Sequence, residues 1–300
     1  MKIKLLFVFL CSLLVANPAV SSENQTLYVS LDTTNKHMFI KAKLGSSVIN
    51  YSLREPSQQT QSNFNSALLK LNSWELDKAF LNQTLGDYEL ALFEPISPML
   101  DKAKHIHFML DKGSFDFALD LISYKGQPLF LQYPVSFSFK PVKVTDEYHF
   151  NEQGNGLTVK DKTTDPESAS LLISEILTNT KHYEMEDISK DQLVNKKKLD
   201  VALLSLHGIA DESEAFMQLN DEQVYAVDLL NLNSELIYLD SCQMGSSYSF
   251  AAMFAQSPIQ FIVAPLFDNE AGGSSSLTIQ SFFTKLSQNI APAKALYLTR

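Results

Sequence analysis

In the second half of the chain, short apolar runs alternate with amphipathic stretches, and this rhythm constrains the fold more than any other feature. Residues 201–206, 235–239 and 260–265 are short, apolar and bounded by polar or turn-forming residues, which predicts three strands. Residues 168–178 and 275–287 carry apolar side chains at helical spacing, which predicts helices. Strands that alternate with helices favour a mostly parallel sheet with helices on both faces. The sequence therefore predicts an α/β fold.

The first half has a less regular pattern. It begins with two β-like runs joined by a polar turn, and Pro and Gly interrupt its later segments. Between the halves, residues 145–166 contain Asn151, Gly154, Asn155 and Gly156, which favour turns and predict a loop. The other predicted elements are strands at residues 26–31, 37–43, 105–110, 115–121, 128–139 and 183–188, and helices at residues 64–80, 88–100, from about 189, and 247–256.

Residues 1–22 have the order of a secretory signal peptide. Lys2 and Lys4 precede an apolar run, and small residues follow it. That run is too short to span a bilayer, and no other stretch of the sequence is long enough. We therefore expect an exported protein, periplasmic or extracellular, with no integral membrane segment after cleavage near Ser21 or Ser22.

Length and charge limit the number of domains and the kinds of partner that this chain can have. With 300 residues, 45% of them hydrophobic, there is material for one large domain or two small ones. The formal net charge of -10 opposes binding to nucleic acid or to an anionic membrane, and it is compatible with a basic substrate. We expect one domain over residues 23–300, made of an N-terminal half (23–140), a loop (141–167) and a catalytic half (168–300).

Two of the predicted strands lead into chemically reactive residues. His207 follows one apolar run directly, and Cys242 follows another after two residues. In a parallel sheet both side chains emerge at the carboxyl edge, where ligands bind. Cys242 is the single cysteine that remains once a leader containing Cys11 is removed, so it has no partner for an internal disulfide. The pattern favours a reactive thiol beside an imidazole.

This pair has the chemistry of a nucleophile and its base. A histidine that accepts the thiol proton leaves a thiolate, which can attack a carbonyl carbon. We expect the backbone N–H groups of Gly208 and Cys242 to stabilise the oxyanion that the attack creates. Such a reaction needs no metal and no other cofactor, and none is expected.

Each of these interpretations has a simpler alternative. Taken alone, Cys242 is better explained as a buried inert thiol, and Asp240 is almost as well explained as a carboxylate that holds a turn. Asp268, in a later loop, either faces the substrate pocket or caps a helix. His105 and His107 alternate along a strand with no set of metal ligands nearby, which indicates core and rim positions.

Several segments of the chain carry a family resemblance. They resemble the histidine, cysteine and closing blocks of the caspase-like cysteine peptidases and, within that clan, the CHAT domain common in bacteria. The resemblance implies a caspase-like three-layer sandwich with a mostly parallel central sheet, and a bacterial host. It also implies an endopeptidase with Cys242 as nucleophile and His207 as base. The segments are residues 106–122, 201–208, 236–245, 261–286 and 291–296.

The chain also departs from the CHAT pattern. Asp240 stands two places before the cysteine, where most CHAT sequences have a small residue. The tryptophan that is usual in the closing strand block is absent, with Phe267 at the nearest position. In metacaspases and clostripain, an acidic residue at the first of these places lies in the pocket for the residue before the cleaved bond. For Asp240, with Asp268 as a second candidate, this implies a preference for Arg or Lys in the substrate.

The expected partners are a protein or peptide substrate and a regulatory protein. Two other functions stay open at this point. One is a catalytically inactive CHAT-like scaffold that binds other exported proteins. The other is an acyl hydrolase or transferase that uses the same two residues on a non-peptide carbonyl.

Overall fold

The structure of the chain is a computed structural model. It describes residues 25–34, 37–54, 89–115, 118–145, 147–195, 198–210, 214–255, 257 and 259–300, with isolated positions at 66, 83 and 86. The signal peptide expected at residues 1–22, and almost all of the helix expected at residues 64–80, lie outside this part. Within it the fold is mixed α/β, as predicted, with two sheets of five strands each and two smaller sheets. No helix in it is long and apolar enough to cross a membrane.

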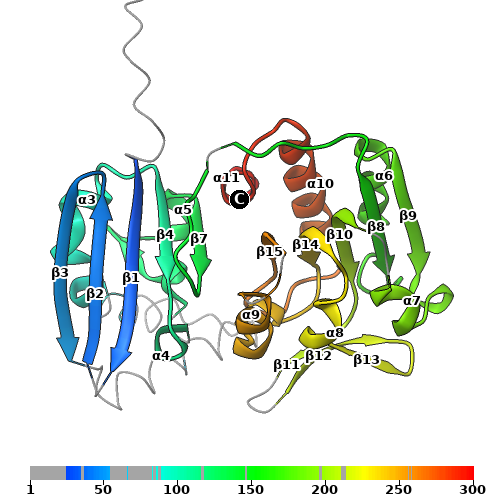
Figure 1. Cartoon of the computed structure of the whole chain (residues 1–300), viewed down its shortest axis with the longest axis horizontal. Coiled ribbons are helices and arrows are strands. Elements are labelled where there is room, and N and C mark those ends of the chain that lie inside the picture. Colours follow the sequence, from blue (N-terminus) through cyan, green and yellow to red (C-terminus); the bar gives the residue numbers. More distant parts are fainter. Residues whose placement is uncertain are drawn as a thin grey trace, which may run out of the picture.

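The first sheet lies in the N-terminal half and is mixed (Figure 1). Its order is β3-β2-β1-β4-β7, in which β1 to β3 form an antiparallel meander, and β4 and β7 continue from β1 in parallel. β1, β2 and β4 were predicted, and β7 lies within the strand predicted at residues 128–139, whereas β3 had no clear signal in the sequence. The strands are β1 (Thr26–Thr34), β2 (His37–Leu44), β3 (Ser47–Arg54), β4 (His105–Met109) and β7 (Val135–Ser138).

One face of this sheet carries an apolar core. Leu27, Val29 and Phe108 contribute to it from the strands, and Phe93 and Ile96 contribute from the segments that cover them. On the other face, β2 and β3 expose mainly polar side chains. The covering elements include η2 (Glu94–Ile96), α3 (Ser97–Leu100), η3 (Leu119–Leu121) and α5 (Leu129–Gln132).

Two segments that were predicted as strands in this half contain helical turns. Of the predicted strand at residues 115–121, Phe115 ends α4 (Lys112–Phe115) and Leu119–Leu121 form η3, where Leu119 and Ile122 enter the core at a spacing of three residues. Residues 128–139 begin with α5 and form β7 only afterwards. A short apolar run fits either a helical turn or a strand, and here packing decides for the turn.

The second sheet lies in the C-terminal half and is parallel throughout (Figure 1). Its order is β15-β14-β10-β8-β9, so the direction of winding reverses between β8 and β10. In open parallel sheets, ligands bind outside the carboxyl ends of the strands at such a reversal. The strands are β8 (Asn155–Lys160), β9 (Asn179–Glu184), β10 (Leu199–Ser205), β14 (Ser234–Leu239) and β15 (Phe261–Val263).

Both faces of this sheet are covered, which confirms the prediction of a parallel sheet between two layers. Leu203 packs with Phe282 and Phe283 on one face, and Leu204 packs in the core that contains Phe250 on the other. The first layer contains α6 (Leu172–Ile176), α10 (Gly273–Ser287) and α11 (Pro292–Tyr297). The second contains α7 (Lys190–Val194), α8 (Ala226–Leu229), α9 (Tyr248–Ala255) and a small sheet of β11 (Gly208–Ala210), β12 (Ala215–Leu219) and β13 (Glu222–Tyr225).

The prediction of a loop over residues 141–167 is wrong in part, because β8 runs through it. Gly154, Asn155 and Gly156 have the composition of a turn, yet Gly156 lies in a strand with neighbours on both sides. A Cβ atom on Gly156 would come within 2.4 Å of the Thr180 Oγ1 on β9. Glycine is therefore needed here because two strands pack closely.

Aromatic side chains join the two halves. The ring of Tyr248, at the start of α9, lies 5.6 Å from that of Phe115 and 5.7 Å from that of Phe139, centroid to centroid. The Lys112 Nζ lies 5.5 Å from the same tyrosine ring. Because α9 follows Cys242 after only a short turn, the segment that carries the candidate nucleophile is attached to both halves of the molecule.

Candidate active site

The structure brings the backbones of the two predicted blocks into contact. Strands β10 and β14 pair in parallel, and the Asp240 N–H donates to the Leu204 carbonyl at 2.8 Å. A Cβ atom on Gly208 would lie 2.4 Å from the Cys242 carbonyl oxygen and 2.9 Å from its nitrogen. His207 and Cys242 therefore stand on the same carboxyl edge of the sheet, on neighbouring strands.

Gly208 has a structural role besides the one expected for its N–H group. A side chain here would collide with the Cys242 backbone. The absence of a side chain is what allows the two strand ends to meet. The role of the two N–H groups in an oxyanion hole stays a prediction.

The imidazole of His207 is held by residues that the sequence did not single out. Its Nε2 lies 2.7 Å from the Thr163 Oγ1 and 3.8 Å from the Asp161 Oδ2, and its side chain is 57% exposed. Asp161 and Thr163 follow β8, inside the segment that was expected to be a loop. Neither residue stood out in the sequence, because β8, the strand that precedes them, was not predicted.

The thiol of Cys242 is half-buried and faces Asn269. Its Sγ lies 3.4 Å from the Asn269 Oδ1 and 3.9 Å from the carbonyl oxygen of the same residue. Asn269 belongs to the loop between β15 and α10, 27 positions along the chain, where no pattern marks it. In the described part of the chain, the hydrogen bonds of the thiol go to Asn269 and none joins it to His207.

The environment of Cys242 favours the protonated thiol. Burial is the largest cause that raises its pKa above the ordinary value, and the carboxylates of Asp268 and Asp240 raise it further. A backbone hydrogen bond at Asn269 acts in the opposite direction. In this conformation the sulfur is a weak nucleophile until a base takes its proton.

Asp240 lies in a buried hydrogen-bond network that includes Asn269, and it is 5% exposed. Its Oδ1 accepts from the Asn269 Nδ2 and the Ser275 Oγ, both at 2.7 Å, and its Oδ2 accepts from the Ser205 Oγ at 2.7 Å. Burial raises the pKa of this carboxyl, and the bonds from Ser275 and Ser205 lower it. The carboxylate supports Asn269 and the end of β10. Whether it also contacts a substrate stays a prediction.

Asp268 helps to hold the turn after the nucleophile. It accepts a hydrogen bond from the Gln243 Nε2 at 2.8 Å, and it is half-buried. Gln243 has a positive φ of 59°, a conformation that few residues other than glycine adopt, and its N–H donates to the Phe267 carbonyl at 3.2 Å. The loop after β15 thus fixes the segment that follows Cys242.

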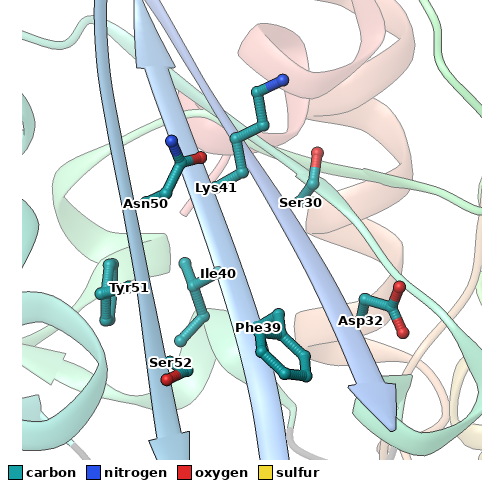
Figure 2. A pocket seen from close by; sticks show the side chains of 8 residues that line it. All are labelled: Ser30, Asp32, Phe39, Ile40, Lys41, Asn50, Tyr51 and Ser52. Carbon is teal, nitrogen blue, oxygen red and sulfur yellow. The ribbon is translucent and has the colours of Figure 1, made fainter.

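Two further features lie away from this edge. A shallow cavity of about 470 Å³ lies on the open face of the first sheet, where the side chains of Phe39, Lys41 and Asn50 line it (Figure 2). In the same sheet, His105 and His107 are buried and each is hydrogen-bonded to Ser136, with the His105 Nε2 and the His107 Nδ1 both 2.8 Å from its Oγ. Among the described residues, no group of three His, Cys, Asp or Glu side chains is placed to hold a metal ion.

Comparisons with models of known protein families and with curated proteins found no match. We therefore infer the function of this chain from its residues and their geometry.

Proposed function

We propose that this chain is an exported, caspase-like cysteine endopeptidase with Cys242 as nucleophile and His207 as general base. The observation that carries the proposal is the contact between the Gly208 and Cys242 backbones at the carboxyl edge of a parallel sheet. Ligands of open parallel sheets bind at this edge. The layers on both faces of the second sheet are what a caspase-like sandwich requires.

The reaction begins when the Cys242 thiol gives its proton to His207. The thiolate forms a bond to the carbonyl carbon of the peptide, and the N–H groups of Gly208 and Cys242 stabilise the oxyanion. The imidazolium returns the proton to the amine as the C–N bond breaks. Water, deprotonated by the same ring, then hydrolyses the thioester and restores the thiol.

We propose further that the substrate carries Arg or Lys before the scissile bond. Asp240 and Asp268 both raise the pKa of the thiol, so negative charge acts on the site. A basic side chain bound there offsets these carboxylates and favours the thiolate. Since Asp268 is half-buried and Asp240 is buried, Asp268 is the more accessible of the two carboxylates.

Fluorogenic peptides with Arg, Lys or Asp before the leaving group test the proposal. We expect hydrolysis of the Arg and Lys peptides, complete loss in Cys242→Ala, and a loss of about 100-fold or more in His207→Ala. His149→Ala, at an exposed position of the linking segment, is the matched control and should keep full activity. Hydrolysis that survives in Cys242→Ala would show that the nucleophile is a different residue.

A second candidate function is a catalytically inactive scaffold that binds other exported proteins. The bond from the thiol to Asn269, together with the raised thiol pKa, favours this reading, because an unused cysteine needs no base. Acyloxymethyl ketone probes that carry Arg or Asp separate the candidates. Labelling of Cys242 by the Arg probe supports the peptidase, labelling by neither supports the scaffold, and preference for the Asp probe contradicts the proposed specificity.

A further inference from the structure

We propose that Asp161 and Thr163 are positioning residues that fix the neutral tautomer of His207, with the proton on Nε2 and the basic lone pair on Nδ1. This inference rests on the proposed function, because it says which nitrogen of the general base receives the thiol proton. It adds two residues to the machinery of the site, both from the end of β8.

The assignment follows from the single hydrogen of the Thr163 hydroxyl. The Thr163 Oγ1 lies 2.8 Å from the Asp161 Oδ1 and 2.7 Å from the His207 Nε2. An ionised carboxylate can only accept, so the hydroxyl donates its hydrogen to Asp161. Toward His207 the hydroxyl oxygen is then left as an acceptor, and Nε2 must be the donor. A neutral imidazole with its proton on Nε2 has its lone pair on Nδ1.

The turn that holds these two residues is fixed to β10. The Asp161 N–H donates to the Ser205 carbonyl at 2.8 Å, and the Thr164 Oγ1 donates to the same carbonyl at 2.7 Å. The Thr163 N–H also donates to the Asp161 Oδ1 at 2.7 Å. Because Ser205 stands only two residues before His207, these bonds set the distance between Thr163 and the imidazole.

Asp161 also places a carboxylate oxygen near the ring. Its Oδ2 lies 3.8 Å from the Nε2, the nitrogen that keeps its proton when Nδ1 takes the proton of the thiol. The flanking strands end in three charged or titratable groups. Lys160 is the last residue of β8, and Asp240 and Cys242 follow β14. Lys160 pairs with Glu184 at 3.5 Å and also bonds to the Ser168 hydroxyl. This arrangement lies at the reversal of winding between β8 and β10, where a ligand of such a sheet binds.

Long-range ¹H–¹⁵N NMR of protein labelled at histidine nitrogen reads the tautomer directly. The signal that disappears in His207→Ala identifies the residue. We expect the neutral ring of the wild type to carry its proton on Nε2, Thr163→Val to give a mixture of both tautomers, and Thr163→Ser to restore the wild-type form. Thr163 is exposed, so none of these substitutions disturbs the core.

The rate of Cys242 alkylation by iodoacetamide at pH 7.5 gives a second readout. We expect Thr163→Val to slow it about fivefold, as the loss of one hydrogen bond implies, and Thr163→Ser to leave it unchanged. A proton on Nδ1 in the wild type, or a Thr163→Val protein with unchanged tautomer and rate, would overturn the inference. If Cys242 is alkylated at the same rate in His207→Ala as in the wild type, the proposed pairing of thiol and imidazole is contradicted. The tautomer measured by NMR is independent of that result.

Discussion

The side-chain amide of Asn269 has only one way to face Cys242. Its Nδ2 donates to the buried Asp240 carboxylate at 2.7 Å, which leaves the Oδ1 directed at the sulfur, 3.4 Å away. An amide oxygen can only accept, so the sulfur must be the donor and must carry its proton. The thiol therefore has to leave this bond before it can act as a nucleophile.

The first prediction concerns the resting thiol. Since burial and two carboxylates raise its pKa, the thiol is protonated at neutral pH, and its alkylation rate increases with pH through a midpoint above that of a free cysteine. The pH dependence of iodoacetamide labelling, followed by mass spectrometry, measures this midpoint. A short cysteine peptide is the reference. A midpoint below pH 7 would mean that His207 already holds the thiolate as an ion pair.

The second prediction separates the two roles of Asp240. Asp240→Asn removes a negative charge that raises the thiol pKa and keeps a side chain of the same shape. Its one oxygen can still accept from Asn269 and Ser275, whereas its amide group must donate to Ser205 instead of accepting from it. We expect alkylation at pH 7 to become about threefold faster, because the loss of one carboxylate lowers the pKa of the thiol. If the carboxylate also favours a basic substrate, hydrolysis of the Arg peptide falls in the same variant.

Asp268→Asn serves as the comparison for this experiment. It removes the other carboxylate that acts on the thiol and leaves the support of Asn269 intact. Faster alkylation in both variants, with a larger loss of Arg hydrolysis in Asp268→Asn, fits direct contact between Asp268 and the substrate. An unchanged alkylation rate in both would show that neither charge reaches the sulfur.

The third prediction uses the contact at Gly208. In Gly208→Ala the new Cβ atom would lie 2.4 Å from a backbone oxygen of Cys242, so one strand end must move. We expect a loss of about 1–3 kcal/mol in the free energy of unfolding, measured with urea, together with lower activity. The control is Gly86→Ala, at a helical position where the added atom meets nothing within 4 Å. That change should be neutral or stabilising by up to about 1 kcal/mol. Equal stability of the two variants would contradict the proposed strand contact.

The strand ends were predictable, and the residues that support them were not. An apolar strand followed by His207 or Cys242 is a local pattern, and parallel pairing then brings the two together. Asn269 and Thr163 have no such pattern, because each contributes one polar atom from an irregular turn. β8 was missed for a related reason. Its glycine at position 156 is required by the Thr180 side chain on the next strand, and a contact of this kind is invisible in the sequence.

The last prediction concerns the buried histidines of the first sheet. Burial, with a smaller contribution from His105, lowers the pKa of His107 from 6.5 to about 4, and the side chain is 4% exposed. In the unfolded chain the residue takes up a proton near pH 6.5, whereas in the folded protein it stays neutral until about pH 4. Between these values the unfolded state binds more protons, so folding stability falls as the pH falls.

The loss of folding stability that His107 causes is negligible above pH 7 and reaches about 2 kcal/mol at pH 5. Urea unfolding at pH 7 and pH 5 measures it. His107→Gln keeps a hydrogen-bonding side chain near Ser136. Between pH 7 and pH 5 we expect this variant to lose about 2 kcal/mol less stability than the wild type loses. His37→Gln, at an exposed position of β2, is the control and should follow the wild type. If the wild type and His107→Gln have the same pH dependence, the pKa of His107 is the same in the folded protein as in the unfolded chain, and burial does not disfavour its charged form.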